Sequence, residues 1–295
     1  MNTAEFIPPA ETTPVASGTL KVRVLRAGLD AHVEKDDRVV VEAPLEFQLH
    51  HPELGLEPVS FGATMRTPGD DEWLAAGLLY GEGIINHASD IDVIEASTRR
   101  PNVVNVRLRS TVQLDVQTPA RRFSAGSSCG VCGTTGLDAA IARAAATRIV
   151  DTGRTDLSVL FRLPERMRGQ QSKFGDTGGI HAAALFDFSG ELLGVAEDVG
   201  RHNALDKLVG ENLLAQRLPL SDKIIILSGR ASFELVQKAV RAGAAVLAAI
   251  GAPSSLAVNL AVASGLTLVG FLRDNRCNIY SNPQRLLGES AAFGA

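Results

Sequence analysis

The chain has few cysteines, no strong excess of charge and none of the common nucleotide-binding motifs. Only 3 of its 295 residues are cysteines, too few for a disulfide framework, which favours a reducing, cytoplasmic location. The formal net charge of −4 argues against nucleic-acid binding as the main function. Neither the phosphate-binding loop of P-loop proteins nor the glycine fingerprint of dinucleotide-binding folds occurs. Because 45% of the residues are hydrophobic, a large core is expected.

A membrane-spanning segment is also not expected. No charged residue occurs between Arg241 and Arg273, a stretch long enough to cross a bilayer. Gly251 and Pro253 help to divide it into short pieces that suit buried strands and a packed helix better. Residues 1–18 contain acids and prolines without an apolar centre, which predicts a disordered tail rather than a signal peptide.

Hydrophobic patterning predicts an α/β protein, α+β overall, with two domains after the tail. Alternating strands and one helix predict a small mixed α+β domain over residues 19–120. The second domain, residues 121–295, begins with a cysteine loop. From Phe174 onward strands alternate with helices, which predicts a largely parallel sheet. Asn203 and Ser232 are expected to cap the first two helices of this second region.

Two cysteines, Cys129 and Cys132, lie in the glycine-rich stretch SSCGVCGTTG, just before a predicted helix. Unpaired N–H groups at a helix start stabilise an anion and lower a thiol pKa, so a reactive thiol pair for sulfur or redox chemistry is the main interpretation. Alternatives remain open: half of a zinc site, a thioredoxin-like dithiol, or an inert buried pair. Cys277 and the scattered histidines do not supply a matching second half, so no metal site is assigned.

Several basic residues occupy loops that follow predicted strands. In open α/β sheets ligands bind beyond the carboxyl ends of the strands, and arginines beside helix starts bind phosphate. The sequence therefore predicts a phosphate-bearing, anionic ligand at that edge. Asp198 is expected to orient His202, and His181 is a candidate ligand or acid/base group after two glycines. The predicted basic rim comprises Arg201, His202, Arg230, Arg273 and Arg276.

At the level of motifs the chain resembles the FdhD family, the sulfurtransferase accessory proteins of formate dehydrogenase. The resemblance covers most of the chain, from the APLEF strand to NIYSNPQRL, and its most specific motifs are SSCGVCG and EDVGRHNALDK. Further matching stretches are TMRTPGDDEWLAAGLLYGEGII, TGGIHAAALFD, SGRASFELVQKA, APSSLAVNLA and GLTLVGFLRDNRCNIYS.

The resemblance implies that Cys129 and Cys132 carry sulfur as a persulfide from a cysteine desulfurase to molybdenum. The receiving cofactor would be bis(molybdopterin guanine dinucleotide), with a GDP-like moiety recognised by the protein, before insertion into formate dehydrogenase. A homodimer is a further implication of the family. The alternative is a zinc-binding or dithiol redox protein without sulfur transfer. The cofactor site implied by FLRDNR comprises Phe271, Leu272, Arg273, Asp274, Asn275 and Arg276.

The family's second domain resembles the cytidine deaminase fold, with three α/β layers, which raises zinc-dependent deamination as a rival activity. Such enzymes need a glutamate two residues after the ligating histidine and a later Cys-x-x-Cys pair. Here Ala183 occupies the glutamate position after His181, and the cysteine pair precedes that histidine. The sequence therefore argues against a deaminase.

Overall fold

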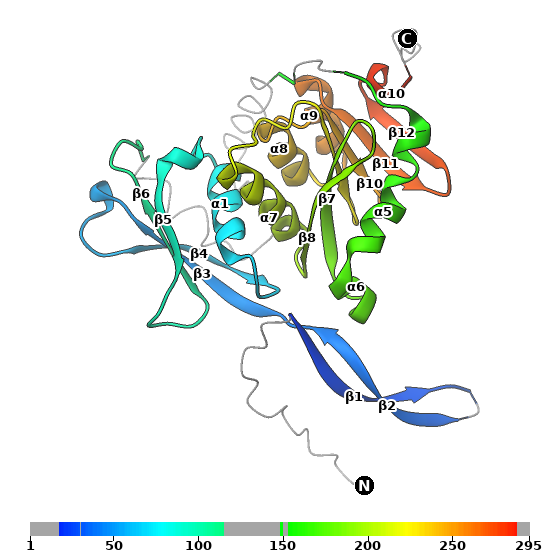
Figure 1. Ribbon diagram of the computed structural model, residues 1–295, viewed down its shortest axis with the longest axis horizontal. Helices are drawn as coiled ribbons and strands as arrows, with labels where there is room; N and C mark the ends of the chain where they lie inside the picture. The colour runs from blue at the N-terminus through cyan, green and yellow to red at the C-terminus, as the bar shows by residue number, and fades with distance from the viewer. Residues whose placement is uncertain (1–17, 30, 115–147, 150–152, 288–295) are drawn as a thin grey trace.

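The computed structural model describes residues 18–29, 31–114, 148–149 and 153–287. The first element is a hairpin of β1 (Thr19–Ala27) and β2 (His32–Val40), which projects from the body of the molecule (Figure 1). Its two strands form a sheet of their own, and most of their side chains are exposed. A lone two-stranded ribbon buries little apolar surface, so this arm gains little stability from its own packing.

A four-stranded sheet follows, in the order β4-β3-β6-β5. Strands β3 and β4 pair antiparallel, β3 and β6 parallel, and β5 and β6 antiparallel. The strand predicted over VSFGATMR is found with those bounds, whereas β5 was not predicted from the sequence. The elements of this part are β3 (Ala43–His50), η1 (Pro52–Leu54), β4 (Val59–Arg66), α1 (Asp71–Gly81), η2 (Ala88–Asp90), β5 (Ile91–Ala96) and β6 (Val103–Leu108).

The larger sheet has six strands in the order β12-β11-β10-β9-β7-β8. Only the β9–β10 and β10–β11 pairs are parallel; the other three pairs are antiparallel, so the expected largely parallel sheet is in fact mixed. The difference arises at both ends of the sheet, where tight hairpins join β7 to β8 and β11 to β12. The strands are β7 (His181–Asp187), β8 (Leu192–Asp198), β9 (Lys223–Leu227), β10 (Val246–Ala249), β11 (Thr267–Arg273) and β12 (Arg276–Ser281).

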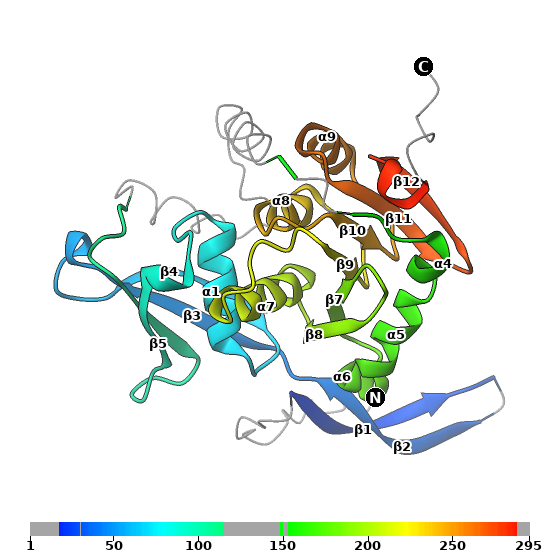
Figure 2. The ribbon, with the colours of Figure 1, turned by 45° about the horizontal axis from the view of Figure 1, so that its top comes forward.

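Helices cover both faces of this sheet, which confirms the three-layer α/β arrangement (Figure 2). Successive side chains of β9 (KIIIL) pack on opposite faces of the sheet. Ile225 packs with α7, α8 and α9, whereas Ile224 packs with α4 and α5. A strand buried on both faces is apolar over its buried length, as Ile224 to Leu227 are. The helices are α4 (Leu157–Leu160), α5 (Leu163–Gln170), α6 (Ser172–Thr177), α7 (Arg201–Leu214), α8 (Phe233–Arg241), α9 (Ser255–Ser264) and α10 (Gln284–Leu287).

Helix α1 packs directly on α7 and joins the two sheets into one hydrophobic core (Figure 1). The approach depends on two glycines: a Cβ on Gly77 would lie 1.9 Å from the carbonyl oxygen of Asp206, and one on Gly210 would lie 1.9 Å from that of Trp73. The hydroxyl of Tyr80 also donates to the carbonyl of Arg241 at 2.7 Å. The predicted boundary near residue 120 lies outside the described residues, so the division into domains stays a prediction.

The cysteine loop and most of the helix predicted over LDAAIARAAATRI fall within residues 115–147, which lie outside the described residues, as do residues 1–17 of the predicted tail. The last two residues of that predicted helix, Arg148 and Ile149, are described and are not helical. Among the helices that the structure describes, none is both long and apolar enough to cross a bilayer.

Candidate functional site

The sheet topology brings the predicted ligand-binding loops to one edge. Strands β8, β9, β10 and β11 all run in the same direction, so their carboxyl ends meet at that edge. Strand β7 runs the opposite way and begins there, with His181 opposite Asp198 in the register. The rim of this edge is therefore formed by the start of α7, the loops 228–232 and 251–255, and the β11–β12 turn.

Backbone hydrogen bonds connect three of these loops. The N–H of Gly251 donates to the carbonyl of Gly229 at 2.9 Å, and the N–H of Phe271 donates to the carbonyl of Gly251 at 3.1 Å. A Cβ on Gly251 would lie 3.1 Å from the Gly229 carbonyl oxygen and from the side chain of Arg230. Glycine thus lets the loops approach closely, and the side chains they carry are held on one continuous surface.

Arg201 and His202 occupy the first turn of α7. Gly200 is the N-cap and Arg201 is the first helical residue, so the expectation that Asn203 caps this helix is wrong. Asn203 is instead buried within the helix, where its side-chain amide donates to the carbonyl of Met65 and to Asp198. The Asn203 amide is therefore used by Met65 and Asp198, and the N-cap of α7 has no side-chain cap hydrogen bond.

The Nε atom of Arg201 is buried without a hydrogen-bond partner among the described residues. A buried N–H without an acceptor is costly, and native proteins usually satisfy such groups. The group lies at a helix start, where the positive end of the helix dipole also favours negative charge. This local chemistry fits a bound anion such as a phosphate oxygen.

His202 lies with Ser232 and Glu234, not with Asp198 as the sequence suggested. Its Nε2 atom is 3.2 Å from the Ser232 hydroxyl and 3.2 Å from the Glu234 carboxylate. Burial, together with the charges of Arg201 and Lys238, lowers the pKa of His202 to about 4. The ring is therefore neutral at pH 7, and a ring that donates from Nε2 has an acceptor at Nδ1.

His181 is half-buried at the first position of β7, and its Nδ1 atom lies 3.5 Å from the hydroxyl of Ser228. Burial, and next the charge of Arg201, lower the pKa of His181. A side chain at Gly229 would meet the imidazole at 3.3 Å, so this loop position needs a small residue. The rim thus combines two neutral imidazoles with a permanently charged guanidinium.

The predicted FLRDNR segment forms the hairpin between β11 and β12. Asp274 and Asn275 have φ angles of 52° and 54°, as the central residues of a tight hairpin turn require. Phe271 also has a positive φ, 54°, and its side chain is 37% exposed beside the loops of the rim. Leu272 differs from its neighbours, because its side chain is fully buried in the core.

Three of the predicted arginines are exposed: Arg230, Arg273 and Arg276. Arg276 lies 3.9 Å from the carboxylate of Asp274, and both side chains remain largely exposed. Weakly paired surface guanidinium groups can exchange their contacts for a stronger anionic partner. The rim therefore carries exposed positive charge at the hairpin and a partly buried guanidinium at Arg201.

A buried polar network behind the rim was not predicted from the sequence. Lys207 forms an ion pair with Asp198 at 2.8 Å and donates to the carbonyl of Thr67 at 2.9 Å. The carboxylate of Glu197 accepts the backbone N–H groups of Lys173 and Phe174 at the start of α6. The sequence signal that could have indicated this network was the presence of acidic residues and a lysine in segments that are otherwise apolar.

The third cysteine, Cys277, lies on β12 and packs against the core between the sheet and α4–α5. Burial raises the pKa of its thiol, so it stays protonated at neutral pH. Within the described part of the chain, no group of three or more histidine, cysteine, aspartate or glutamate side chains is arranged to hold a metal ion. Cys129 and Cys132 lie outside the described residues.

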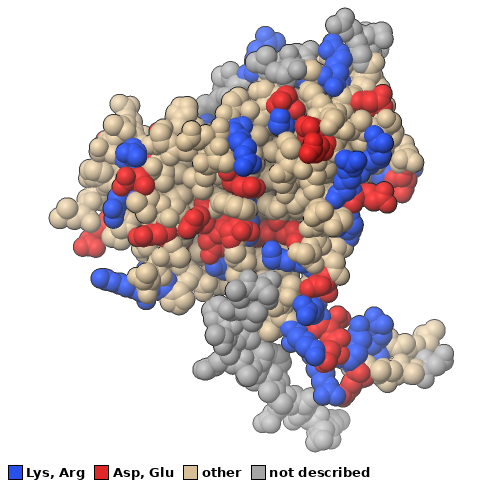
Figure 3. Space-filling view, viewed as in Figure 1, with Lys and Arg blue, Asp and Glu red and all other residues tan. Residues whose placement is uncertain are grey.

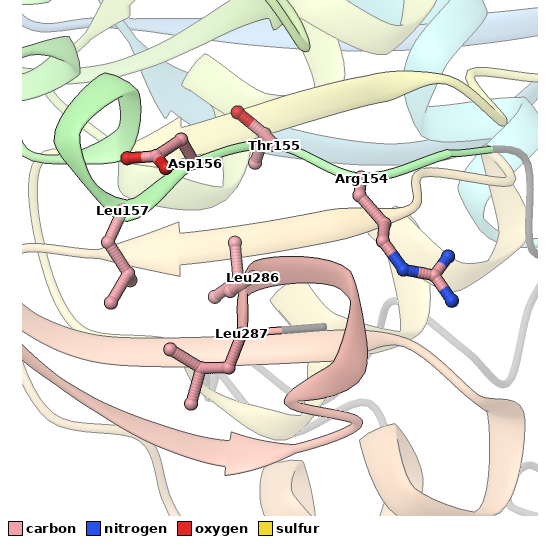
Figure 4. A pocket seen from close by; sticks show the side chains of 6 residues that line it. All are labelled: Arg154, Thr155, Asp156, Leu157, Leu286 and Leu287. Carbon is pink, nitrogen blue, oxygen red and sulfur yellow. The ribbon is translucent and has the colours of Figure 1, made fainter. Parts of the chain in front are cut away.

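A separate hollow of about 560 Å³ lies at the opposite edge of the large sheet, where β12 ends and α10 begins (Figure 4). Asp156 already accepts the N–H of Ser158 at 2.6 Å, and the N–H of Thr155 donates to the carbonyl of Arg285. These polar groups serve the local fold rather than a ligand. The hollow is lined by Arg154, Thr155, Asp156, Leu157, Leu286 and Leu287.

The chain matches the FdhD/NarQ family over residues 40–287. It is 47% identical over 283 residues to the sulfur carrier protein FdhD of Streptomyces avermitilis, covering 93% of this chain and 98% of the relative. It is 40% identical over 267 residues to the sulfur carrier protein FdhD of Sulfurisphaera tokodaii, covering 90% and 98%.

Among solved structures, the fold is similar to a crystal structure described as a formate dehydrogenase accessory protein from Desulfotalea psychrophila. The TM-score is 0.70 with 24% identity, and the match covers 91% of this chain and 99% of that one. This likeness extends over both sheets and supports the fold. Since the family match spans most of the sequence, the chain belongs to the FdhD/NarQ family.

Proposed function

We propose that this protein is a sulfur carrier that supports the maturation of formate dehydrogenase. The observation that carries the proposal is the 47% identity, over almost the full length of both chains, to a relative named sulfur carrier protein FdhD. The cysteine pair Cys129 and Cys132 provides the sulfur chemistry that such a carrier needs. The basic rim provides a place for an anionic substrate.

Loading is a thiol exchange. The thiolate of Cys129 or Cys132 attacks the outer sulfur of a persulfide on a cysteine desulfurase. A new sulfur–sulfur bond forms on the carrier, the donor's sulfur–sulfur bond breaks, and the donor cysteine leaves as a thiolate. No external oxidant or reductant is consumed in this step.

The receiving substrate is the molybdenum of bis(molybdopterin guanine dinucleotide). Its GDP-like moieties carry phosphates, which match the unpartnered Nε of Arg201 and the exposed arginines Arg230, Arg273 and Arg276. The exposed ring of Phe271 offers an apolar surface beside the same loops. His181 and His202 add neutral polar groups to the rim.

Release uses the second cysteine. Its thiolate attacks the inner sulfur of the persulfide, a disulfide forms between Cys129 and Cys132, and the outer sulfur leaves as sulfide toward molybdenum. Two electrons are thereby taken from the cysteine pair, so a cellular dithiol reductant must restore it before the next cycle. This requirement follows from the electron balance of the step.

The decisive test is the intact mass of the protein after incubation with a cysteine desulfurase and cysteine. Wild type is compared with Cys129→Ala and Cys132→Ala. A gain of one sulfur atom that is removed by reductant, and that is lost in one or both variants, supports the carrier and identifies the accepting thiol. No gain, with metal retained on the cysteines, instead supports the zinc-binding alternative.

A second test asks whether the cysteine loop accepts sulfur while the basic rim binds the cofactor. Arg273→Ala combined with Arg276→Ala is expected to weaken binding of the molybdenum cofactor while persulfide loading proceeds as in the wild type. Loss of loading in this variant would contradict a rim that serves the cofactor alone.

The partners follow from the same proposal: a cysteine desulfurase as donor, formate dehydrogenase as the final recipient, and a second copy of the chain in a homodimer. A reducing cytoplasm suits a carrier whose thiols must be regenerated. Light scattering of the purified protein measures the oligomeric state, and a monomer at micromolar concentration would contradict the dimer.

A further inference from the structure

The connection between β4 and α1 contacts the rim loop through a fully buried residue, Thr67. All three of its polar groups are used. Its N–H donates to Asp198 Oδ2 at 3.1 Å, its hydroxyl accepts the N–H of Val199 at 3.1 Å, and its carbonyl accepts Lys207 Nζ at 2.9 Å. One residue of the smaller sheet region therefore binds the strand end, the loop and the helix that form the rim.

Asp198 extends this contact to the start of α7. Its Oδ1 atom accepts the N–H of Gly200 at 2.8 Å and the side-chain amide of Asn203 at 3.0 Å. The same amide donates to the carbonyl of Met65 at 2.8 Å. The backbone N–H groups of both residues between β8 and α7 are thus held, one by Thr67 and one by Asp198.

These bonds lie immediately before Arg201. Gly200 is the N-cap in an extended conformation, with φ −92° and ψ 120°, and it has no side chain to fix the turn. The direction in which Arg201 leaves the turn is therefore set by the acceptors of the two preceding N–H groups. One of those acceptors, the Thr67 hydroxyl, comes from a segment more than 130 residues earlier in the sequence.

We infer that Thr67 is a positioning residue for the anion site, so that the smaller sheet region serves to orient Arg201 and His202 on the rim. The inference rests on the proposed function, because it names the residue that holds the proposed phosphate-binding turn. Without the Thr67 hydroxyl, the N–H of Val199 loses its acceptor inside the protein. The turn must then shift to find another acceptor or water, and Arg201 moves with it.

Titration calorimetry with guanosine diphosphate tests the inference on the full-length protein. Thr67→Val keeps the shape but removes the hydroxyl, and it is expected to weaken binding about tenfold, because the turn that carries Arg201 shifts when the N–H of Val199 loses its acceptor. Thr67→Ser keeps the hydroxyl and is expected to bind like the wild type. This rescue separates positioning from simple filling of space, because serine is the smaller residue.

Tyr80→Phe is the matched control. It removes another hydrogen bond between the same two regions, from the Tyr80 hydroxyl to the carbonyl of Arg241, far from the rim loop. It is expected to lower the melting temperature without changing guanosine diphosphate affinity. Equal weakening by Thr67→Val and Tyr80→Phe, or wild-type affinity in Thr67→Val, would overturn the inference.

Two further results are decisive. If Thr67→Val does not fold, Thr67→Ala is compared with Thr67→Ser in its place, with the same expected tenfold difference for the same unpaired N–H. If the wild type binds no guanosine diphosphate, the proposed anion site fails and this inference fails with it. Persulfide loading, measured by intact mass, still tests the carrier function independently.

Discussion

The buried contact between α7 and the end of β8 and the exposed β1–β2 hairpin each contain a lysine–aspartate pair, in opposite environments. Lys207 and Asp198 are 2.8 Å apart, with side chains 1% and 0% exposed. Lys21 and Asp36 are 2.7 Å apart, with side chains 68% and 59% exposed. The two distances are nearly equal, so distance alone cannot rank the pairs.

The two ion pairs differ in how much of each side chain is buried. In the interior each charge has lost its water, and removing one partner leaves the other uncompensated. On the hairpin, positive and negative side chains alternate on a solvated surface (Figure 3), where water and salt screen each pair. Breaking the buried pair is therefore expected to lower the unfolding free energy strongly, whereas breaking the exposed pair is expected to change it little. The following four predictions compare the buried interior with the exposed surface.

The largest effect is expected for Lys207→Met, which removes the charge that balances Asp198. The loss should be about 4 kcal/mol of unfolding free energy, because a buried carboxylate is left without its partner. Urea denaturation followed by circular dichroism measures it. Combining the change with Asp198→Asn should recover part of the loss, and a single variant as stable as the wild type would contradict a buried pair.

Gly210→Ala is expected to cost about 3 kcal/mol or more, because the new methyl group must push helix backbones apart. Its Cβ would lie 1.9 Å from the carbonyl oxygen of Trp73. Gly169→Ala on α5 is the matched control, since a Cβ there meets nothing within 4 Å. The control should stabilise the protein by about 0.5–1 kcal/mol through helix propensity, and equal behaviour of both variants would argue against close helix contact.

A pH-dependent effect is expected at His202, whose pKa falls from 6.5 to about 4 on folding. Below pH 6.5 the unfolded chain binds a proton that the folded protein does not, so stability falls as pH decreases from about 6.5 toward 4. The contribution is about 2 kcal/mol, allowing for the 23% of the side chain that water reaches. His202→Gln should show a flatter stability profile over this range, and an unchanged slope would contradict a neutral buried imidazole.

The smallest effect is expected for Lys21→Met on the hairpin. Removing this exposed charge should change the unfolding free energy by less than about 0.5 kcal/mol. The measurement is the same urea titration used for Lys207→Met, so the two lysines are compared directly. A loss near that of Lys207→Met would show that the hairpin is packed against something in solution.

Several elements follow from local pattern alone. The alternation of VSFGATMR predicted β4 with its observed bounds, and the serine before FELVQKAVR marked the start of α8. The edge strands β5 and β12 were missed. Edge strands bury fewer side chains and carry more polar residues, so their periodicity is weak until a neighbouring strand is known.

From the sequence alone we could predict which loops reach the ligand edge, because alternating strands and helices return each following strand in the same direction. The reversed directions of β7 and β12 became known only from the tertiary structure. The sequence also indicated the basic residues of that edge. Tertiary structure alone decided the roles within EDVGRHNALDK: Asp198 and Lys207 are buried, whereas Arg201 and His202 face the rim. Those roles depend on Thr67, which lies 131 residues from Asp198 in sequence. Burial and pairing across such a separation arise from packing, and no local pattern encodes them.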